Sequence, residues 1–163
     1  SANGVLIGLA SSLGGKLQVG ANALGDELIK MISPNAGAGQ QVINVTRQYK
    51  VQTTDGASTL LATLLVPTST NVLVNWKVGC NQHGGTAGAV GDGACYERTY
   101  RALRLAAGDA VLKKVQTDFT HEDVGGFNVD FAKSGNNILT NVTGAIDRNL
   151  AWSALAEIMI FKD

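Results

Sequence analysis

The sequence predicts an all-β chain: an antiparallel, jelly-roll-like β-sandwich of about eight strands, preceded by an extended or partly helical N-terminal arm. From residue 41 onward, apolar residues recur at every second position, which is the period of a half-buried strand. Turn signals separate these runs, and no helical pattern lies between them. Residues 1–40 lack this period and are rich in Gly, Ala, Leu and Ser. We therefore expect an apolar arm over 1–40 and a sandwich domain over 41–163.

The arm is expected to bind a partner through its apolar side chains. Asn22 is a candidate cap for a short helix, and a second apolar stripe precedes it. Because so short a segment cannot build a core of its own, these side chains should find their cover on another molecule. The predicted partner-binding residues of the two stripes are Leu6, Leu9, Leu13, Leu24, Leu28 and Met31.

The strands of the domain follow from the alternation. In the second strand, Leu60 and Ala62 are expected on one face with Leu64 and Val66. Trp76 and Trp152 lie on strand faces rich in aliphatic residues, which predicts that both belong to the core. Residues 95–107 also fit one face of a helix, but we favour a strand because their neighbours are strands. The expected strands are 41–51, 60–66, 72–78, 95–107, 111–117, 127–132, 138–142 and 149–161.

Residues 79–93 contain six glycines and are predicted to form a long surface loop or hairpin tip. Asn81, Gln82 and His83 would be exposed on it. Cys80 and Cys95 lie at its two ends, and they admit either a disulfide or two buried thiols. We favour the thiols.

Charge and composition limit the partners. Lys plus Arg number 13 and Asp plus Glu number 13, so the net charge is zero and nothing attracts nucleic acid or an anionic membrane. No apolar run reaches the ~20 residues of a membrane span. Charged residues make up 16% of the chain, below the usual quarter. This composition indicates either a surface covered by partners, such as copies of the chain itself, or simply a small β protein rich in Thr, Asn and Gly.

No catalytic motif is present, so we expect a protein that is not an enzyme and has no cofactor. Two weaker alternatives exist. A zinc site could use Cys80, His83 and Cys95 with Asp92 or His121. Paired carboxylates could bind calcium or act as acid and base; the candidates are Asp118, Glu122 and Asp123. Arginines at positions 98, 101 and 104 alternate faces on a strand, so at least one should point inward or meet a partner's carboxylate.

Short strings in the C-terminal two-thirds carry a resemblance. They are residues 62–67 (ATLLVP), 71–78 (NVLVNWKV), 91–96 (GDGACY), 134–139 (SGNNIL), 142–145 (VTGA) and Trp152. In this order the chain resembles a family of bacteriophage virion β-sandwich domains, which occurs in capsid decoration or cement proteins, head fibres and tail-fibre tips. Residues 1–40 match nothing in it.

The resemblance implies a structural protein of the virion, assembled in the host cytoplasm and commonly trimeric, with no shared catalytic residues. A short chain without a shaft favours a cement or decoration protein that associates with itself and binds the major capsid protein or another virion protein. The alternative is the receptor-binding tip of a tail or head fibre. In that case the loop with Asn81, Gln82 and His83 would face the receptor, beside aromatic residues that could stack on sugars.

Overall fold

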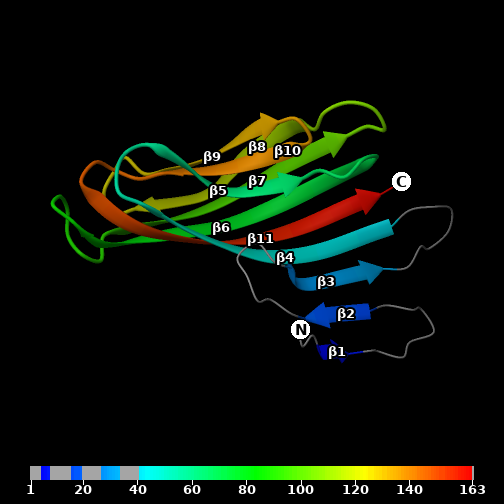
Figure 1. Ribbon diagram of the computed structural model, residues 1–163, viewed down its shortest axis with the longest axis horizontal. Coiled ribbons are helices and arrows are strands. Elements are labelled where there is room, and N and C mark those ends of the chain that lie inside the picture. Colours follow the sequence, from blue (N-terminus) through cyan, green and yellow to red (C-terminus); the bar gives the residue numbers. More distant parts are fainter. Residues whose placement is uncertain (1–4, 8–15, 20–26, 34–40, 163) are drawn as a thin grey trace.

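The computed structural model describes residues 5–7, 16–19, 27–33 and 41–162, and these residues form strands, turns and loops but no helix (Figure 1). The strands in chain order are β1 (Val5–Ile7), β2 (Lys16–Val19), β3 (Glu27–Ser33), β4 (Gln41–Thr53), β5 (Ser58–Leu65), β6 (Thr70–Gly85), β7 (Gly93–Arg104), β8 (Val111–Glu122), β9 (Asn128–Ser134), β10 (Asn137–Thr143) and β11 (Arg148–Lys162).

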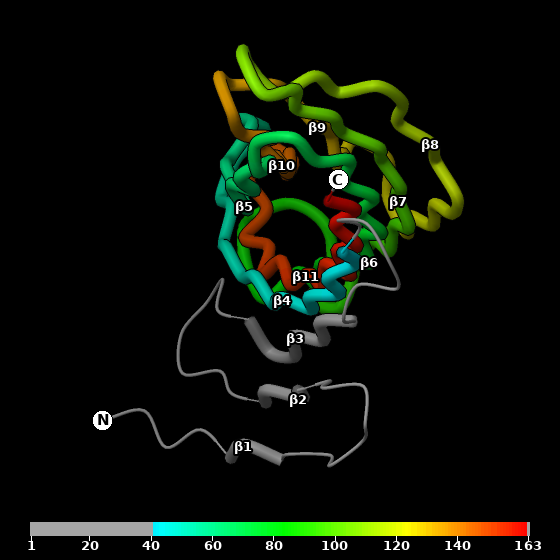
Figure 2. The backbone as a smooth tube through the Cα atoms, turned by 90° about the vertical axis from the view of Figure 1, so that its right-hand side faces the viewer, coloured from blue at the N-terminus to red at the C-terminus, as the bar shows by residue number. Residues whose placement is uncertain are grey.

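Two antiparallel sheets make up the fold. The large sheet has the order β1-β2-β3-β4-β11-β6-β7-β8, and the small sheet has the order β5-β10-β9. The small sheet faces the curved middle of the large one, and β7 and β8 rise along one side (Figures 1 and 2). From β4 onward there are eight strands, so the predicted β-sandwich of about eight strands is confirmed.

The core lies between the sheets, on what we call the inner face of the large sheet. Val45, Ile158, Val74 and Tyr100 are cross-strand neighbours on β4, β11, β6 and β7, and all four are buried. The small sheet covers this row with further buried apolar side chains, among them Ile138 on β10. Alternation therefore places one face of β4, β6, β7 and β11 in the core, as the period of two predicts.

Both tryptophans belong to this core, as predicted. Trp76 is 0% exposed, and its ring lies 5.5 Å from that of Tyr49 and 6.4 Å from that of Phe131. Trp152 is also buried, and its indole Nε1–H donates a hydrogen bond of 3.0 Å to Thr53 Oγ1. That bond satisfies the polar atom which burial would otherwise leave unpaired.

The face assignment of Leu60 in β5 is wrong. The register between β5 and β10 shifts at Thr140 and Asn141, which leaves Leu61 as an extra residue in a β-bulge. The extra residue reverses the alternation, so Leu61 is buried and Leu60 is 50% exposed. Ala62, Leu64 and Val66 are buried as expected.

The short helix expected in the arm is also wrong where the structure describes it. Glu27–Ser33 is strand β3, and it pairs with the free edge of β4, with Met31 opposite Asn44. Hydrogen bonds to the neighbouring strand satisfy backbone N–H and C=O groups that would lack partners at the ends of an isolated short helix. Residues 22–26, with the candidate cap Asn22, lie outside the described residues.

The ambiguous segment 95–107 is a strand, as predicted, up to Arg104, and residues 105–107 lie in the following turn. It forms most of β7, and Gly108 turns the chain with a φ of 103°. Arg98 faces inward: it is buried, donates to the carbonyl of Phe119 at 2.6 Å, and lies 4.9 Å from the centre of the Tyr96 ring. Arg104 lies on the same face and donates to the carbonyl of Val66 at 3.3 Å. Arg101 is exposed and donates to Asn71 Oδ1.

Candidate functional site

The opposite side of the large sheet, which we call the outer face, carries no second layer within residues 41–162. Cross-strand neighbours in one of its rows are Asn44, Met159, Leu73 and Arg101 on β4, β11, β6 and β7. Each of these residues precedes or follows a buried residue of the inner face. The same strands therefore present a core on one side and a free surface on the other.

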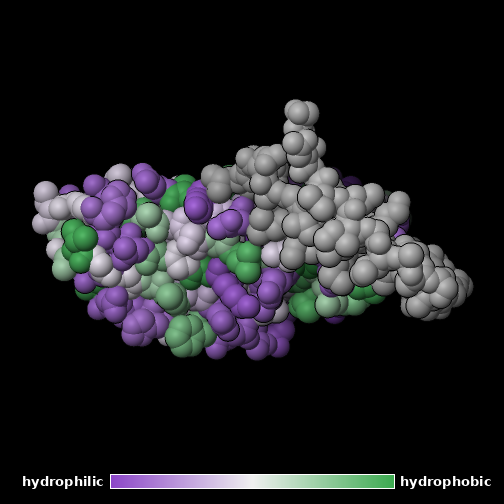
Figure 3. All heavy atoms as spheres, turned by 90° about the horizontal axis from the view of Figure 1, so that it is seen from below, coloured by the Kyte–Doolittle hydropathy of each residue, from purple (hydrophilic) through white to green (hydrophobic). Residues whose placement is uncertain are grey.

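Large apolar side chains are exposed on this outer face. Leu73 and Met159 are directly paired, and Phe161 follows two residues along β11; they are 39%, 36% and 39% exposed. We call these three residues the outer-face strip. A shallow depression of about 310 Å³ adjoins it, lined by Leu73, Met159 and polar neighbours such as Asn75. Figure 3, which shows the molecule from below, has apolar side chains interspersed with polar ones.

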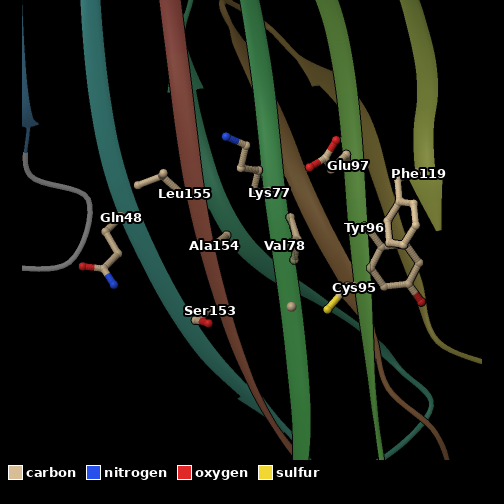
Figure 4. A pocket seen from close by; sticks show the side chains of 11 residues that line it. Gln48, Lys77, Val78, Cys95, Tyr96, Glu97, Phe119, Ser153, Ala154 and Leu155 are labelled. Carbon is tan, nitrogen blue, oxygen red and sulfur yellow. The ribbon is translucent and has the colours of Figure 1, made fainter. Parts of the chain in front are cut away.

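A second depression of about 360 Å³ lies further along the outer face (Figure 4). Gln48, Leu155, Lys77, Glu97 and Phe119 cross it as one row of neighbours on five strands. The lining also includes Gly79 and Ser153, whose small size lowers the surface between larger neighbours. The depression is open and mixed in polarity, so it offers a contact surface rather than an enclosed ligand site.

The free edge of β8 is protected. β8 ends the large sheet, and almost all of its residues are exposed, including Phe119 at 50%. Two register shifts against β7 leave Lys113 and Asp118 as extra, bulged residues. Bulges and lysines are common devices that prevent an edge strand from pairing with another chain. The β8 edge is therefore poorly suited to pairing with a strand of another chain.

The predicted exposed loop is shorter than expected, and one of its three residues is buried. β6 continues to Gly85 and β7 begins at Gly93, so only residues 86–92 connect them. Asn81 and His83 are exposed, as predicted. Gln82 is 1% exposed, which corrects the prediction, because a residue between two exposed strand residues points to the opposite face.

Gln82 is the centre of a polar cluster that holds the β6–β7 hairpin. Its Nε2 donates to the carbonyls of Gly84 and Ala87, and its Oε1 accepts from Arg148 Nη1 at 3.0 Å. Arg148 also donates to Asp92 Oδ2 at 3.0 Å, with side chains 14% and 25% exposed. The backbone N–H of Ala89, and then the Arg148 guanidinium, lower the pKa of Asp92 below its ordinary value.

Glycine is required at the tip of this hairpin. Gly88 has a φ of 70°, and a Cβ atom there would lie 2.2 Å from Arg148 Nη1. A side chain would therefore displace the guanidinium from Gln82 and Asp92. This close approach gives a specific reason for one of the six glycines in the segment that the sequence predicted as a loop or hairpin tip.

The two cysteines are free thiols on opposite faces. In the register of β6 and β7, Cys95 is opposite Gly79, while Cys80 is opposite Ala94. Neighbouring positions on a strand point to opposite sides, so the two sulfur atoms cannot meet. Cys80 is half-buried, and burial raises its pKa to about 11. Cys95 is exposed, so the expectation of two buried thiols is wrong for it.

The three carboxylates near residue 120 do not converge. Asp118 accepts from Thr99, Glu122 accepts from the Tyr96 hydroxyl at 2.9 Å, and Asp123 accepts from the backbone N–H of Gly93. Asp118 and Glu122 are four residues apart on one strand, a separation of roughly 13 Å. Among the described residues, no group of three His, Cys, Asp or Glu side chains is placed to hold a metal ion.

The arm residues are placed only in part. Leu6 lies in β1, and Leu28 and Met31 lie in β3. Leu9, Leu13 and Leu24 lie outside the described residues. The three arm strands continue the large sheet beyond β4. The binding of a partner by this arm stays a prediction.

Sequence reasoning missed the outer-face strip, although the alternation contained a signal for it. Leu73 falls between Val72 and Val74 on the polar side of β6, and Met159 and Phe161 occupy the same side of β11. A large apolar residue on the polar side of a strand indicates either a second buried layer or a contact surface.

Within the described ranges, no helix is long and apolar enough to span a membrane. The chain matches no family model, no curated protein and no solved structure.

Proposed function

We propose that this chain is a structural protein of a bacteriophage particle, a capsid cement or decoration protein that associates with copies of itself, as a trimer, and binds the capsid surface. The observation that carries the proposal is the outer-face strip, which leaves large apolar side chains exposed on the sheet face opposite the core. The sequence resemblance to virion β-sandwich domains gives the proposal its biological setting.

The energetics of the outer face fit association with other chains. Leu73, Met159 and Phe161 keep between 36% and 39% of their surface in water, and burying that surface against a partner is favourable by about 25 cal/mol per Å². Zero net charge removes long-range repulsion between copies. In a particle many such modest contacts act together, so each can be weak while the assembly is stable.

Sedimentation and native mass spectrometry test the self-association. We expect the wild-type protein to form a defined oligomer. The double variant Leu73→Ser/Met159→Ser should have a dissociation constant at least about tenfold higher, because apolar contacts at the centre of an interface dominate its affinity. Val90→Ser is the matched control because Val90 is 77% exposed on the hairpin tip, away from the strip. A monomeric wild type, or equal weakening by the control, would contradict the role of the strip.

A capsid-binding assay tests the second part of the proposal. A variant that lacks residues 1–35 is compared with wild type for binding to undecorated capsids. We expect its occupancy to fall because the arm is proposed to contact capsid subunits. Full occupancy by the shortened variant would rule out that role of the arm.

The alternative function is the receptor-binding tip of a tail or head fibre. Asn81 and His83 are exposed near the end of β6, next to a hairpin tip where Val90 is 77% exposed. Trp76 and Trp152 are buried and provide no stacking surface. Saturable, sugar-specific binding on a glycan array, lost in Asn81→Ala/His83→Ala, would favour this alternative over the cement function.

A further inference from the structure

We propose that Cys95 and His121 form one half of a zinc site, and that the same two residues of a second copy complete it. The inference rests on the proposed self-association and adds a contact to it: identical residues of two copies meet across a two-fold axis, which a trimer lacks, so the zinc ion would join two associated species. It concerns a different set of ligands from the Cys80 and His83 pattern in the sequence. Cys80 points to the other face of the sheet from Cys95, so that pattern cannot close around one ion.

The backbone register places the two ligands side by side. Cys95 on β7 is directly opposite His121 on β8, and both residues are exposed. Directly opposite residues of an antiparallel pair have Cβ atoms about 4.5–5.5 Å apart and share a face. A thiolate and an imidazole at that separation can both reach one zinc ion, whose bonds to sulfur and nitrogen are about 2.3 Å and 2.0–2.1 Å.

Gly79 leaves the Cys95 thiol free to turn. In Figure 4 the sulfur of Cys95 lies between β6 and β7. It is 3.9 Å from the point where a Cβ atom of Gly79 would be, so no side chain on that neighbouring residue confines it. Binding one metal ion together with His121 requires rotation about the Cα–Cβ bond of Cys95, which turns the sulfur of this exposed side chain toward β8.

A held carboxylate positions the imidazole. Asp123 Oδ1 lies 3.3 Å from His121 Nε2, while its Oδ2 accepts the Gly93 N–H at 2.9 Å. The Asp123 N–H in turn donates to the Gly93 carbonyl at 3.0 Å. When Nε2–H donates to this carboxylate, Nδ1 carries the lone pair for a metal. Most zinc-bound histidines have such a partner on their second nitrogen.

The number of ligands points to a second copy of the chain. Structural zinc sites have four protein ligands, commonly two Cys and two His. No third metal-binding side chain joins Cys95 and His121 within the part of the chain that the structure describes. Two copies that meet near these residues would supply the Cys₂His₂ set. The site lies on the outer face, to which the strip also belongs.

Zinc titration followed by native mass spectrometry tests the proposal on the full chain. For wild type we expect one zinc ion per two chains and a doubling of the mass of the associated species. Cys95→Ser and His121→Gln should each weaken zinc binding at least tenfold, while Cys80→Ser should bind as wild type does. Asp123→Ala should weaken it about 10- to 100-fold, because it removes the acceptor of the second nitrogen.

Alkylation supplies an independent readout. Zinc should protect Cys95, but not Cys80, from a maleimide reagent in the wild-type protein. One zinc per chain without a change of mass, no binding, or unaltered binding in Cys95→Ser would overturn the proposal. Self-association is also measured in the presence of a chelator. If the oligomer still forms there, and added zinc causes no further change of mass, the zinc site is refuted and the proposed self-association is not.

Discussion

The two faces of the large sheet are built from the same strands but meet opposite requirements. On the inner face, Val74 and Trp76 of β6 are completely buried, whereas Leu73 between Val72 and Val74 on the outer face is 39% exposed. The inner face is covered by the small sheet of the same chain. The outer face has no such cover within residues 41–162. The comparison teaches that the buried face of each strand determines the fold, whereas the exposed face can carry large apolar residues without changing it.

The largest effect is expected on the inner face. Trp76→Ala should lower the free energy of unfolding by about 3–5 kcal/mol, because it removes a fully buried ring that packs against Tyr49 and Phe131. Urea unfolding followed by circular dichroism measures it. A loss below about 1 kcal/mol would mean that the sandwich does not depend on this ring.

A smaller loss is expected at the hairpin cluster. Arg148→Ala leaves the buried Gln82 Oε1 and the Asp92 carboxylate without their shared donor, which should cost about 1–3 kcal/mol of unfolding free energy. Arg101→Ala is the control, since it removes an arginine whose hydrogen bond to Asn71 is exposed. Equal losses in both variants would show that the cluster contributes no more than a surface contact.

The two cysteines, which lie on opposite faces of the large sheet, should differ in their rate of alkylation. At pH 8 the thiolate of Cys80 should be about one part in a thousand, because burial raises its pKa to about 11. Maleimide or iodoacetamide should therefore modify the exposed Cys95 first, and the rate at Cys80 should rise as the pH approaches 11. Peptide mass mapping of wild type and Cys95→Ser measures both rates. Rapid modification of Cys80 at pH 8 would contradict its burial.

The smallest effect on stability is expected at the outer face. Met159→Ser should change the free energy of unfolding by no more than about 0.5 kcal/mol, since Met159 is exposed and contributes little to the core. The measurement must be made at a concentration where the protein is monomeric. A loss comparable to that of Trp76→Ala would show that the outer face is covered within the same chain.

Much of the sandwich could be predicted from the sequence because a period of two is a local property. It placed Trp76 and Trp152 in the core and identified 95–107 as a strand. It failed at Leu60 because the bulge at Leu61 depends on pairing with β10, which local alternation does not contain. It failed for Glu27–Ser33 because an available edge of β4 overrode the helical spacing. Glycine content also hid the true length of β6, whose last residues pair with β11.

The site was less predictable than the fold. Gln82 was expected on the surface because loops are usually exposed, yet its burial follows from a strand that continues to Gly85. Cys95 and His121 are 26 positions apart in the chain, and only the register of β7 and β8 makes them neighbours. Neither fact can be read from residue types alone.

The bulges of β8 bear on whether copies of the chain could stack edge to edge. A flat terminal strand would accept the next molecule, which would accept another, and growth would continue into fibres. With Lys113 and Asp118 displaced from the ladder, that route of propagation is disfavoured. Copies at high concentration would then find no flat ladder at β8 along which a fibre could grow.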